Sequence, residues 1–392
     1  MRKADGKNNN GMRAKPLVIV AVTALVLIGA AIGCWFGIRA IAHYEENALD
    51  IAQMEVTERN DQLAEQYAKE LADYQQEVEA RAGANAAWPT PTGEGWEIVD
   101  LTNYPLENAQ TRTMTRQETM YGGMLLVNEW HSRPDDFSED TLVSMYSYSR
   151  GQGNTLSLRN SSIRLFSEAA EAFYDMIMGA GEAGYEYKYY VIQNAYRSWD
   201  EQNELFQNAL ARHESRYSGD ALIARAKQDV NYPGTSSYNS GTTAQIILYE
   251  RNNTEVNNKV FFESPEGLWV YENSWQYGIV FRFPLSDYPV NGTLDKSYKT
   301  GVGTKLQTFN YVGKGNAAAM HTLNLCMEEY VEYLMEHPHI AIFENGTLRY
   351  EISRQYVGDS DSFSVQMVGN GNVRDCSVCL DNMGYVIAVF EY

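Results

Sequence analysis

An apolar run from Leu17 to Ile38, in which no residue carries a charge, constrains this chain more than any other feature. About 20 apolar residues in a helix cross a bilayer core, so the run is long enough to span a membrane. Five basic residues precede it: Arg2, Lys3, Lys7, Arg13 and Lys15. Because basic residues favour the cytoplasmic side, the pattern predicts a cytoplasmic tail over 1–15 and a single-pass transmembrane helix over 16–42. The main domain would then be extracellular, held at the cell membrane.

Two other kinds of segment share part of this pattern. A cleaved signal peptide has a short apolar region and a small-residue cleavage site, whereas apolar character here continues to Ile41 without a clear site. A lipoprotein signal would place the lipid on Cys34, in the sequence AIGC, but WFGI follows that cysteine instead of a polar tether. The uncleaved anchor therefore fits the sequence better than either alternative.

Residues 43–83 predict a helical stalk, because they contain no proline, no glycine before Gly83, and many Glu, Gln and Ala residues. Five apolar residues recur at spacings of three and four: Leu63, Tyr67, Leu71, Tyr74 and Val78. This spacing gives a helix one apolar face, which could pair two copies into a homodimer or pack on the chain's own domain. Fewer heptads are visible than a coiled coil needs. The Pro- and Gly-rich segment 84–95 then predicts a linker.

Helical and strand patterns are mixed in the rest of the chain, which predicts an α+β fold. Residues 96–337 have the size of one ordinary domain. Within it, 163–180 is amphipathic with helical spacing, GIVFRF resembles a strand, and 316–337 is helical again. After Pro338, short alternating runs separated by Gly or Asn-Gly predict a small β module over 338–392.

The net charge of −20 argues against a nucleic acid as a partner, because phosphate binding needs a clustered basic surface. The four cysteines do not form a disulfide framework. Cys376 and Cys379 make a C-x-x-C, but no second pair completes a zinc site. Residues three apart on a strand face opposite sides, so a disulfide between the two is disfavoured, although the sequence leaves it open.

Three blocks in order along the chain carry a resemblance to a known family. They are NAYRSWDEQNELF (194–206), PGTSSYNSGTTAQI (233–246) and TKLQTFNYVG (304–313). They resemble the signature blocks of VanY-type D-alanyl-D-alanine carboxypeptidases, and the similarity extends over most of residues 120–335. The resemblance implies a VanY-type domain over 96–337, of the kind that trims peptidoglycan stem peptides with a zinc ion.

The residues at the family's zinc positions are not zinc ligands here. The family blocks read S-x-H-x-x-G-x-A-x-D and E-x-W-H. In this chain the two His positions and the Asp position are Tyr238, Thr308 and Gln245, and the catalytic Glu position is Lys305. Zinc takes imidazole, carboxylate or thiolate, and a phenol ionises only near pH 10. A lysine cannot accept the proton of a bound water. We therefore expect no metal, no cofactor and no catalytic residue.

Two other catalytic arrangements fit less well. His131, His321, His337 and His339 lie away from the family's ligand positions, and singly placed histidines are usually surface or hydrogen-bonded residues. The triplets SYN (237–239) and KTG (299–301) look like two motifs of penicillin-binding proteins. The third motif, S-x-x-K, supplies the nucleophile and appears nowhere in the chain.

Several residues outside the metal positions do match the family. Arg197, Ser198 and Gln202 match its Y-R-S-x-x-x-Q block, in which the resemblance gives the arginine a role in stabilising negative charge on the substrate. With Ser236 and Lys305 they are the predicted substrate-binding residues. The sequence thus predicts a catalytically inactive homologue that binds peptidoglycan stem peptide or a cell-wall protein. An active peptidase with non-standard metal ligands and a purely structural scaffold are the alternatives.

Overall fold

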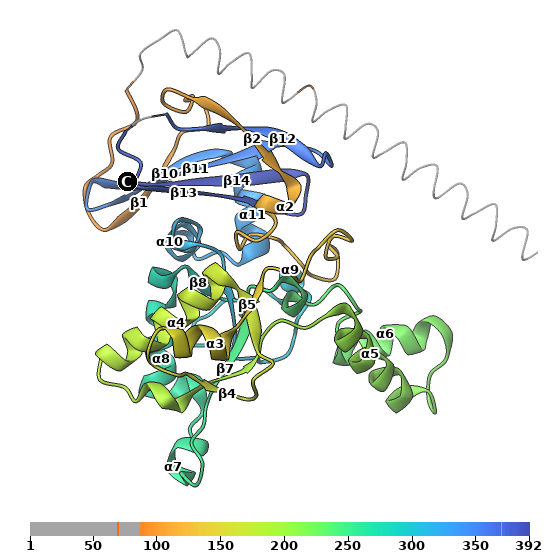
Figure 1. The fold of residues 1–392 in the computed structure, drawn as a ribbon. Helices are drawn as coiled ribbons and strands as arrows, with labels where there is room; N and C mark the ends of the chain where they lie inside the picture. Colours follow the sequence, from red (N-terminus) through yellow and green to blue (C-terminus); the bar gives the residue numbers. More distant parts are fainter. Residues whose placement is uncertain (1–68, 70–86, 370) are drawn as a thin grey trace, which may run out of the picture. The chain divides into compact units, whose positions relative to one another are not determined.

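The computed structural model describes residues 69, 87–369 and 371–392, and two five-stranded sheets organise them (Figure 1). The first sheet has the order β4-β6-β7-β9-β8, and only its β4–β6 pair is parallel. Its strands are Ser157–Leu158 (β4), Tyr190–Asn194 (β6), Thr243–Leu248 (β7), Thr308–Tyr311 (β9) and Ile279–Phe281 (β8). The second sheet is antiparallel, in the order β1-β10-β11-β14-β13. Its strands are Trp96–Asp100 (β1), His339–Glu344 (β10), Thr347–Tyr356 (β11), Tyr385–Glu391 (β14) and Asp375–Leu380 (β13).

Helix α4 (Ser167–Glu182) covers one face of the first sheet. Its buried side, which includes Phe173 and Ile177, packs with Tyr190 of β6 and Ile246 of β7. The sequence pattern predicts this helix from residue 163. The helix begins later because Arg164–Phe166 forms a strand, β5, that pairs with β3 (Leu142–Ser144).

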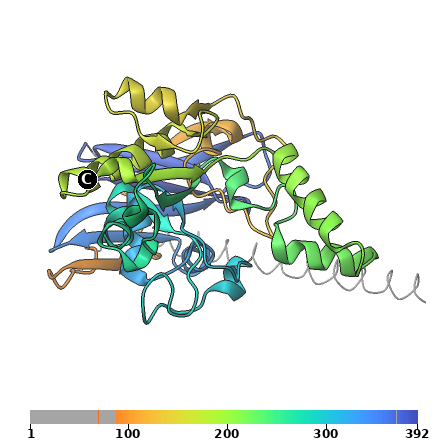
Figure 2. The same cartoon turned by 90° about the horizontal axis from the view of Figure 1, so that it is seen from below.

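Two helices follow β6 and form a hairpin at one side of the first sheet, visible in Figures 1 and 2. Helix α5 (Trp199–His213) begins at Ser198, whose hydroxyl accepts from the Glu201 N–H while the Glu201 carboxylate accepts from the Ser198 N–H. This reciprocal cap fixes the start of the helix. Helix α6 (Gly219–Asp229) packs on α5 through a small apolar contact that includes Phe206 and Ala226.

The second sheet is covered on both faces. Helices α10 (Lys314–Leu323) and α11 (Met327–Glu336) pack on the face that carries Ile340, Ile352 and Ile387. A two-stranded ribbon of β2 (Gln110–Thr115) and β12 (Ser362–Met367) contributes to the core on the other face. The strands after Pro338 therefore take two partners, β1 and β2, from the region before it.

The remaining elements are short. They are α2 (Arg116–Thr119), α3 (Met145–Gly151), η1 (Tyr187–Tyr189), η2 (Ser237–Ser240), α7 (Thr254–Asn257), η3 (Phe261–Glu263), α8 (Pro265–Asn273), η4 (Ser274–Tyr277) and α9 (Ser297–Thr300). Cys376 is exposed and Cys379 is buried on β13, and both are free thiols, so the disulfide that the sequence leaves open is absent.

The predicted transmembrane helix over 16–42 lies outside the described residues, and so does nearly all of the stalk over 43–83. Within the described part of the chain, no helix combines the length and the apolar character needed to cross a bilayer.

Candidate functional site

Three segments that are far apart in the sequence meet on the first sheet. Gln245 of β7 pairs with Thr308 of β9 on one side and with Asn194 of β6 on the other. Tyr238, in the 3-10 turn that precedes β7, places its hydroxyl 3.0 Å from Thr308 Oγ1. The three positions that the sequence aligns with zinc ligands therefore come together in space.

Tyr238 lies in the interior, with 8% of its surface exposed. The guanidinium of Arg197 lies over its ring, with Cζ 4.8 Å from the ring centroid. Burial raises the pKa of the Tyr238 phenol, and this effect outweighs the Thr308 hydrogen bond and the Arg197 charge, which lower the pKa. The phenol is therefore neutral at physiological pH. Its hydroxyl contacts Thr308, and its ring contacts the Arg197 guanidinium.

Gln245 is also hydrogen-bonded to a neighbouring side chain. Asn194 Nδ2 donates to Gln245 Oε1 at 2.5 Å. The register between β6 and β7 shifts between Ile192 and Asn194, which brings the two amides opposite each other at the end of the strand. The carbonyl oxygen of Gln245 is thus used by another amide.

Arg197 is held by helix α5 through its side chain and by the turn that carries Tyr238 through its backbone. Its Nη1 donates to Gln202 Oε1 at 2.8 Å, and the buried Gln202 donates onward to the Asn231 carbonyl at 2.7 Å. The backbone of Arg197 donates to the Tyr238 carbonyl at 3.0 Å, and its own carbonyl accepts from Asn239 Nδ2 at 2.6 Å. Burial lowers the pKa of Arg197 from its usual value, although an arginine keeps its proton at neutral pH.

The two predicted serines lie close to this network, but each has a local structural task. Ser198 caps α5, as described above. Ser236 is buried at the start of the turn that carries Tyr238, where its N–H donates to Asn239 Oδ1 at 3.2 Å. Gln202 positions Arg197. Among the predicted substrate-binding residues, Arg197 is therefore the one whose charged group is oriented by another of them, Gln202.

Lys305 occupies the position of the family's catalytic glutamate and is exposed. Its Nζ lies 5.3 Å from the centroid of the Tyr288 ring. None of the ion pairs formed by the described residues involves Lys305, so no carboxylate neutralises its charge. The Tyr288 hydroxyl beside it is buried and finds no hydrogen-bond partner in the described part of the chain.

Comparison with known proteins finds similarity to D-alanyl-D-alanine carboxypeptidases. Residues 162–296 match the family model for VanY, D-alanyl-D-alanine carboxypeptidase. The chain is 29% identical over 250 residues to a D-alanyl-D-alanine carboxypeptidase of Enterococcus faecium, covering 63% of this chain and 69% of that protein. It is 24% identical over 243 residues to a protein of the same name from Enterococcus faecalis, covering 62% and 76%.

One solved structure extends the likeness to most of the fold. It is a vancomycin-resistance D,D-dipeptidase, VanXYg, in complex with a D-Ala-D-Ala phosphinate analogue. The TM-score is 0.52 at 19% identity, over 72% of this chain and 99% of that one. Over residues 162–296 this chain therefore resembles the VanY-type family, and most of its fold is shared with VanXYg. We call the cluster of Tyr238, Gln245 and Thr308 the VanY-type site. The family match ends before Thr308, so the pairing of β9 with β7 is what brings this position into the site.

The zinc ion that VanY-type chemistry implies does not fit the residues present. The three side chains at its positions are a neutral phenol, an amide and a hydroxyl, all poor zinc donors. The phenol and the hydroxyl are already bonded to each other, and the amide oxygen is bonded to Asn194. In the described ranges, no group of three or more His, Cys, Asp or Glu side chains is arranged to hold a metal ion.

The histidines that the sequence offers as replacement ligands have other partners. The ring of His131 contacts Asn128 Oδ1 at 3.0 Å, and His321 stacks on Trp275 at 4.4 Å between centroids. His337 lies 3.0 Å from Asp100 Oδ2. His339 is buried on β10, between the Tyr104 carbonyl and the Glu351 carboxylate. None of these contacts involves the VanY-type site.

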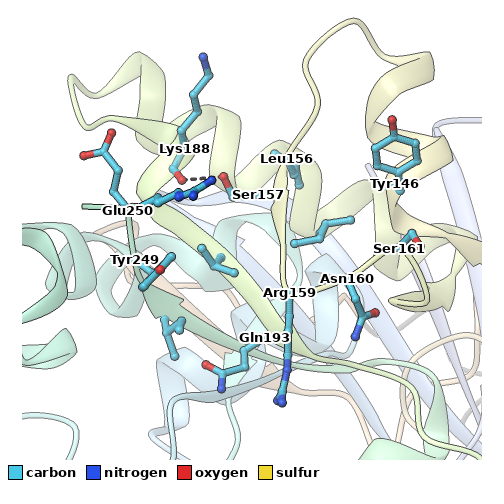
Figure 3. Close-up of a pocket in the computed structure, with 14 residues that line it drawn as sticks. Tyr146, Leu156, Ser157, Arg159, Asn160, Ser161, Lys188, Gln193, Tyr249 and Glu250 are labelled. Atoms are coloured by element: carbon cyan, nitrogen blue, oxygen red, sulfur yellow. Dashed lines mark hydrogen bonds between the residues drawn. The ribbon is translucent and has the colours of Figure 1, made fainter. Parts of the chain in front are cut away.

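Sequence reasoning missed a feature on the same sheet. The face opposite α4 carries two cavities, of about 930 and about 550 Å³, and both are lined by Arg159, Asn160, Ser161 and Gln193. In Figure 3, which shows the larger cavity, Arg159 and Gln193 lie between Tyr249 and Asn160. The smaller cavity reaches Arg197. We call the two together the β6 trough. No motif in the sequence around Arg159 marks it.

Proposed function

We propose that this protein is a VanY-type homologue without zinc or peptidase activity, which binds a carboxylate-terminated peptide such as a peptidoglycan stem peptide. The observation that carries the proposal is the hydrogen bond between Tyr238 and Thr308. It joins two of the three ligand positions to each other, and neither side chain can replace an imidazole at zinc.

The charges at the site suit a carboxylate better than a metal. Relative to the family pattern, Lys305 replaces a glutamate and Gln245 replaces an aspartate, so negative charge is lost and one cation is gained. Arg197 donates to Gln202 through Nη1, which leaves its other N–H groups for a ligand. Charge-assisted hydrogen bonds to a carboxylate are worth roughly 1.5–3 kcal/mol each. The D-Ala-D-Ala phosphinate analogue bound to VanXYg supports a ligand of the same peptide class.

We also propose that the protein is anchored in the cell membrane. The uncharged run Leu17–Ile38 with basic residues before it supports a single membrane anchor, with the VanY-type domain outside the cell. A binding protein held in this way would meet the cell wall rather than a cytoplasmic partner.

A peptidase assay tests the loss of activity. Full-length protein should release no D-alanine from a peptide that ends in D-Ala-D-Ala, because Lys305 cannot act as a base. The Enterococcus faecium carboxypeptidase serves as the positive control. Turnover by the wild-type protein that a chelator abolishes would instead support an active peptidase with non-standard metal ligands.

Calorimetric titration tests the binding. The proposal expects a peptide with a free C-terminal carboxylate to bind, and its C-terminal amide to bind more weakly. Arg197→Ala and Lys305→Glu should each weaken binding of the free acid. Absence of saturable binding, or unchanged binding in both variants, would show that the site does not hold a carboxylate.

A further inference from the structure

The β6 trough follows one strand of the first sheet. Its lining begins at Lys188, just before β6, continues through Val191 and Gln193, and ends at Arg197, beyond the strand. Alternate residues of a strand face opposite sides. Tyr190 and Ile192 point into the core under α4, and Val191 and Gln193 therefore form the floor of the trough.

The trough is rich in positive charge, although the chain as a whole has a net charge of −20. It is lined by five cationic and three anionic side chains. The cations are Arg159, Arg164, Lys188, Arg197 and Arg251, and the anions are Glu201, Glu204 and Glu250. Two of the three carboxylates accept local hydrogen bonds, Glu201 from the Ser198 N–H and Glu250 from Asn253.

Arg159 is the central cation, because it lines both cavities. Its side chain is exposed, and its backbone N–H donates to the Ile192 carbonyl at 3.1 Å, which fixes the residue beside β6. The hydrogen bonds and ion pairs of the described residues do not include its guanidinium. By contrast, Arg164 is paired with Glu139 at 3.3 Å. Arg159 thus presents an unpaired positive charge to the middle of the trough.

The shape and the other polar groups suit an extended peptide. The five residues of β6 correspond to a length of roughly 16 Å, which is enough for about five extended residues. Amides of Asn160, Gln193 and Asn194 offer hydrogen bonds along this length, and Leu156 and Val191 offer apolar contacts between them. β4 is an edge strand, so its outer side also has backbone groups available.

We propose that the β6 trough binds an extended peptide that carries a second carboxylate, and that Arg159 recognises this internal carboxylate while Arg197 holds the C-terminal one. The assignment of the C-terminus rests on the proposed function above. The second carboxylate is an additional requirement, since it depends on the part of the trough beyond the VanY-type site. The ligand class is therefore an acidic peptide rather than a dipeptide.

Four synthetic pentapeptides of one sequence test this proposal: one with both carboxylates free, one with the internal carboxylate as an amide, one with the C-terminus as an amide, and one with both as amides. Each is titrated into full-length wild-type protein, Arg159→Ala, and the control Arg150→Ala. Arg150 is an exposed arginine at the end of α3 that does not line the trough, so the control makes the same change in charge.

We expect Arg159→Ala to weaken binding of the peptide with two carboxylates by about tenfold, the size of one lost charge-assisted hydrogen bond. The same substitution should leave binding of the peptide with the internal amide unchanged, and Arg150→Ala should bind all four peptides like wild type. Arg159 is exposed, and matching thermal unfolding of the variants would show that folding is not the cause of any loss.

The outcomes separate this inference from the proposed function. If only the C-terminal amide weakens binding and Arg159→Ala has no effect, the inference is wrong and the proposed function stands. If only the internal amide weakens binding, in an Arg159-dependent way, Arg159 recognition stands and the C-terminal assignment fails. If none of the four peptides binds wild-type protein, both fail.

Discussion

The hydroxyl of Tyr238 lies 3.0 Å from Oγ1 of Thr308, across the junction of the turn before β7 and the first residue of β9. Both side chains are buried. Two positions that serve metal binding in the VanY-type pattern are thus joined directly in this protein. The contact has become part of the packing of the sheet, and its loss should be measurable as a loss of stability.

A double-mutant cycle tests that contact. Tyr238→Phe and Thr308→Val should each lower the free energy of unfolding by about 1–3 kcal/mol, because each leaves a buried hydroxyl without its partner. The double variant should lose less than the sum of the two. Urea denaturation measures the three values, and Tyr356→Phe, which changes an exposed tyrosine, is the control. Strictly additive losses would mean that the two hydroxyls do not interact in solution.

Metal analysis tests the donor set. Wild-type protein dialysed against zinc and then against buffer should retain no stoichiometric ion, because Tyr238, Gln245 and Thr308 are poor ligands. The matched variant carries Tyr238→His, Gln245→Asp and Thr308→His, and should retain more zinc than wild type. One tightly held ion per wild-type chain would overturn the prediction and point to ligands elsewhere.

A buried ion pair between Arg282, which follows β8, and Glu328 of α11 predicts that the stability of the fold depends on pH. Arg282 donates to both carboxylate oxygens of Glu328 at 2.9 and 2.6 Å, and Asn128 donates to the same carboxylate at 3.0 Å. Burial by itself would raise the pKa of Glu328, but Arg282 and Asn128 outweigh it and hold the pKa below its ordinary value. A carboxyl with a lowered folded-state pKa stabilises the fold above its unfolded pKa, about 4.3, and this contribution falls as pH drops further.

Glu328→Gln should therefore cost about 3–5 kcal/mol at pH 7, because it leaves the Arg282 charge buried without a counter-ion. The variant should also lose less stability than wild type between pH 4 and pH 3. Urea denaturation across this range gives both values. Glu332→Gln removes a carboxylate that is 54% exposed and paired with Lys299, and should cost about 1 kcal/mol or less. Equal costs for the two variants would contradict the role of burial.

The mature N-terminus tests the predicted anchor. If residues 16–42 form an uncleaved transmembrane helix, the protein extracted from membranes should retain them. Mass spectrometry of the intact protein measures this directly. A mature chain that begins at or near Cys34 would favour the lipoprotein or signal-peptide alternative.

The sequence predicted the resemblance to the VanY-type family and the meeting of its three ligand positions. Each block is a short local pattern, and its other residues keep their spacing although the ligand residues are replaced. Phe309, Tyr311 and Gly313 match the family pattern and fix the register of the last block, so Thr308 could be placed although it is not a histidine. The alternating pattern after Pro338 likewise predicted strands. In these cases the information lies within a few residues along the chain.

The tertiary structure decided which distant segments share a sheet and which side chains share a cavity. No local pattern shows that β1 pairs with β10, or that β2 pairs with β12, because antiparallel pairing over such separations depends on how the whole chain folds back. The same holds for Arg159 and Arg197, which reach one trough from different segments. The sequence by itself determined the residue types at the site, and with them the proposal that the site holds no zinc. The fold determined what those residues contact, because packing and hydrogen bonding bring together side chains that the sequence keeps far apart.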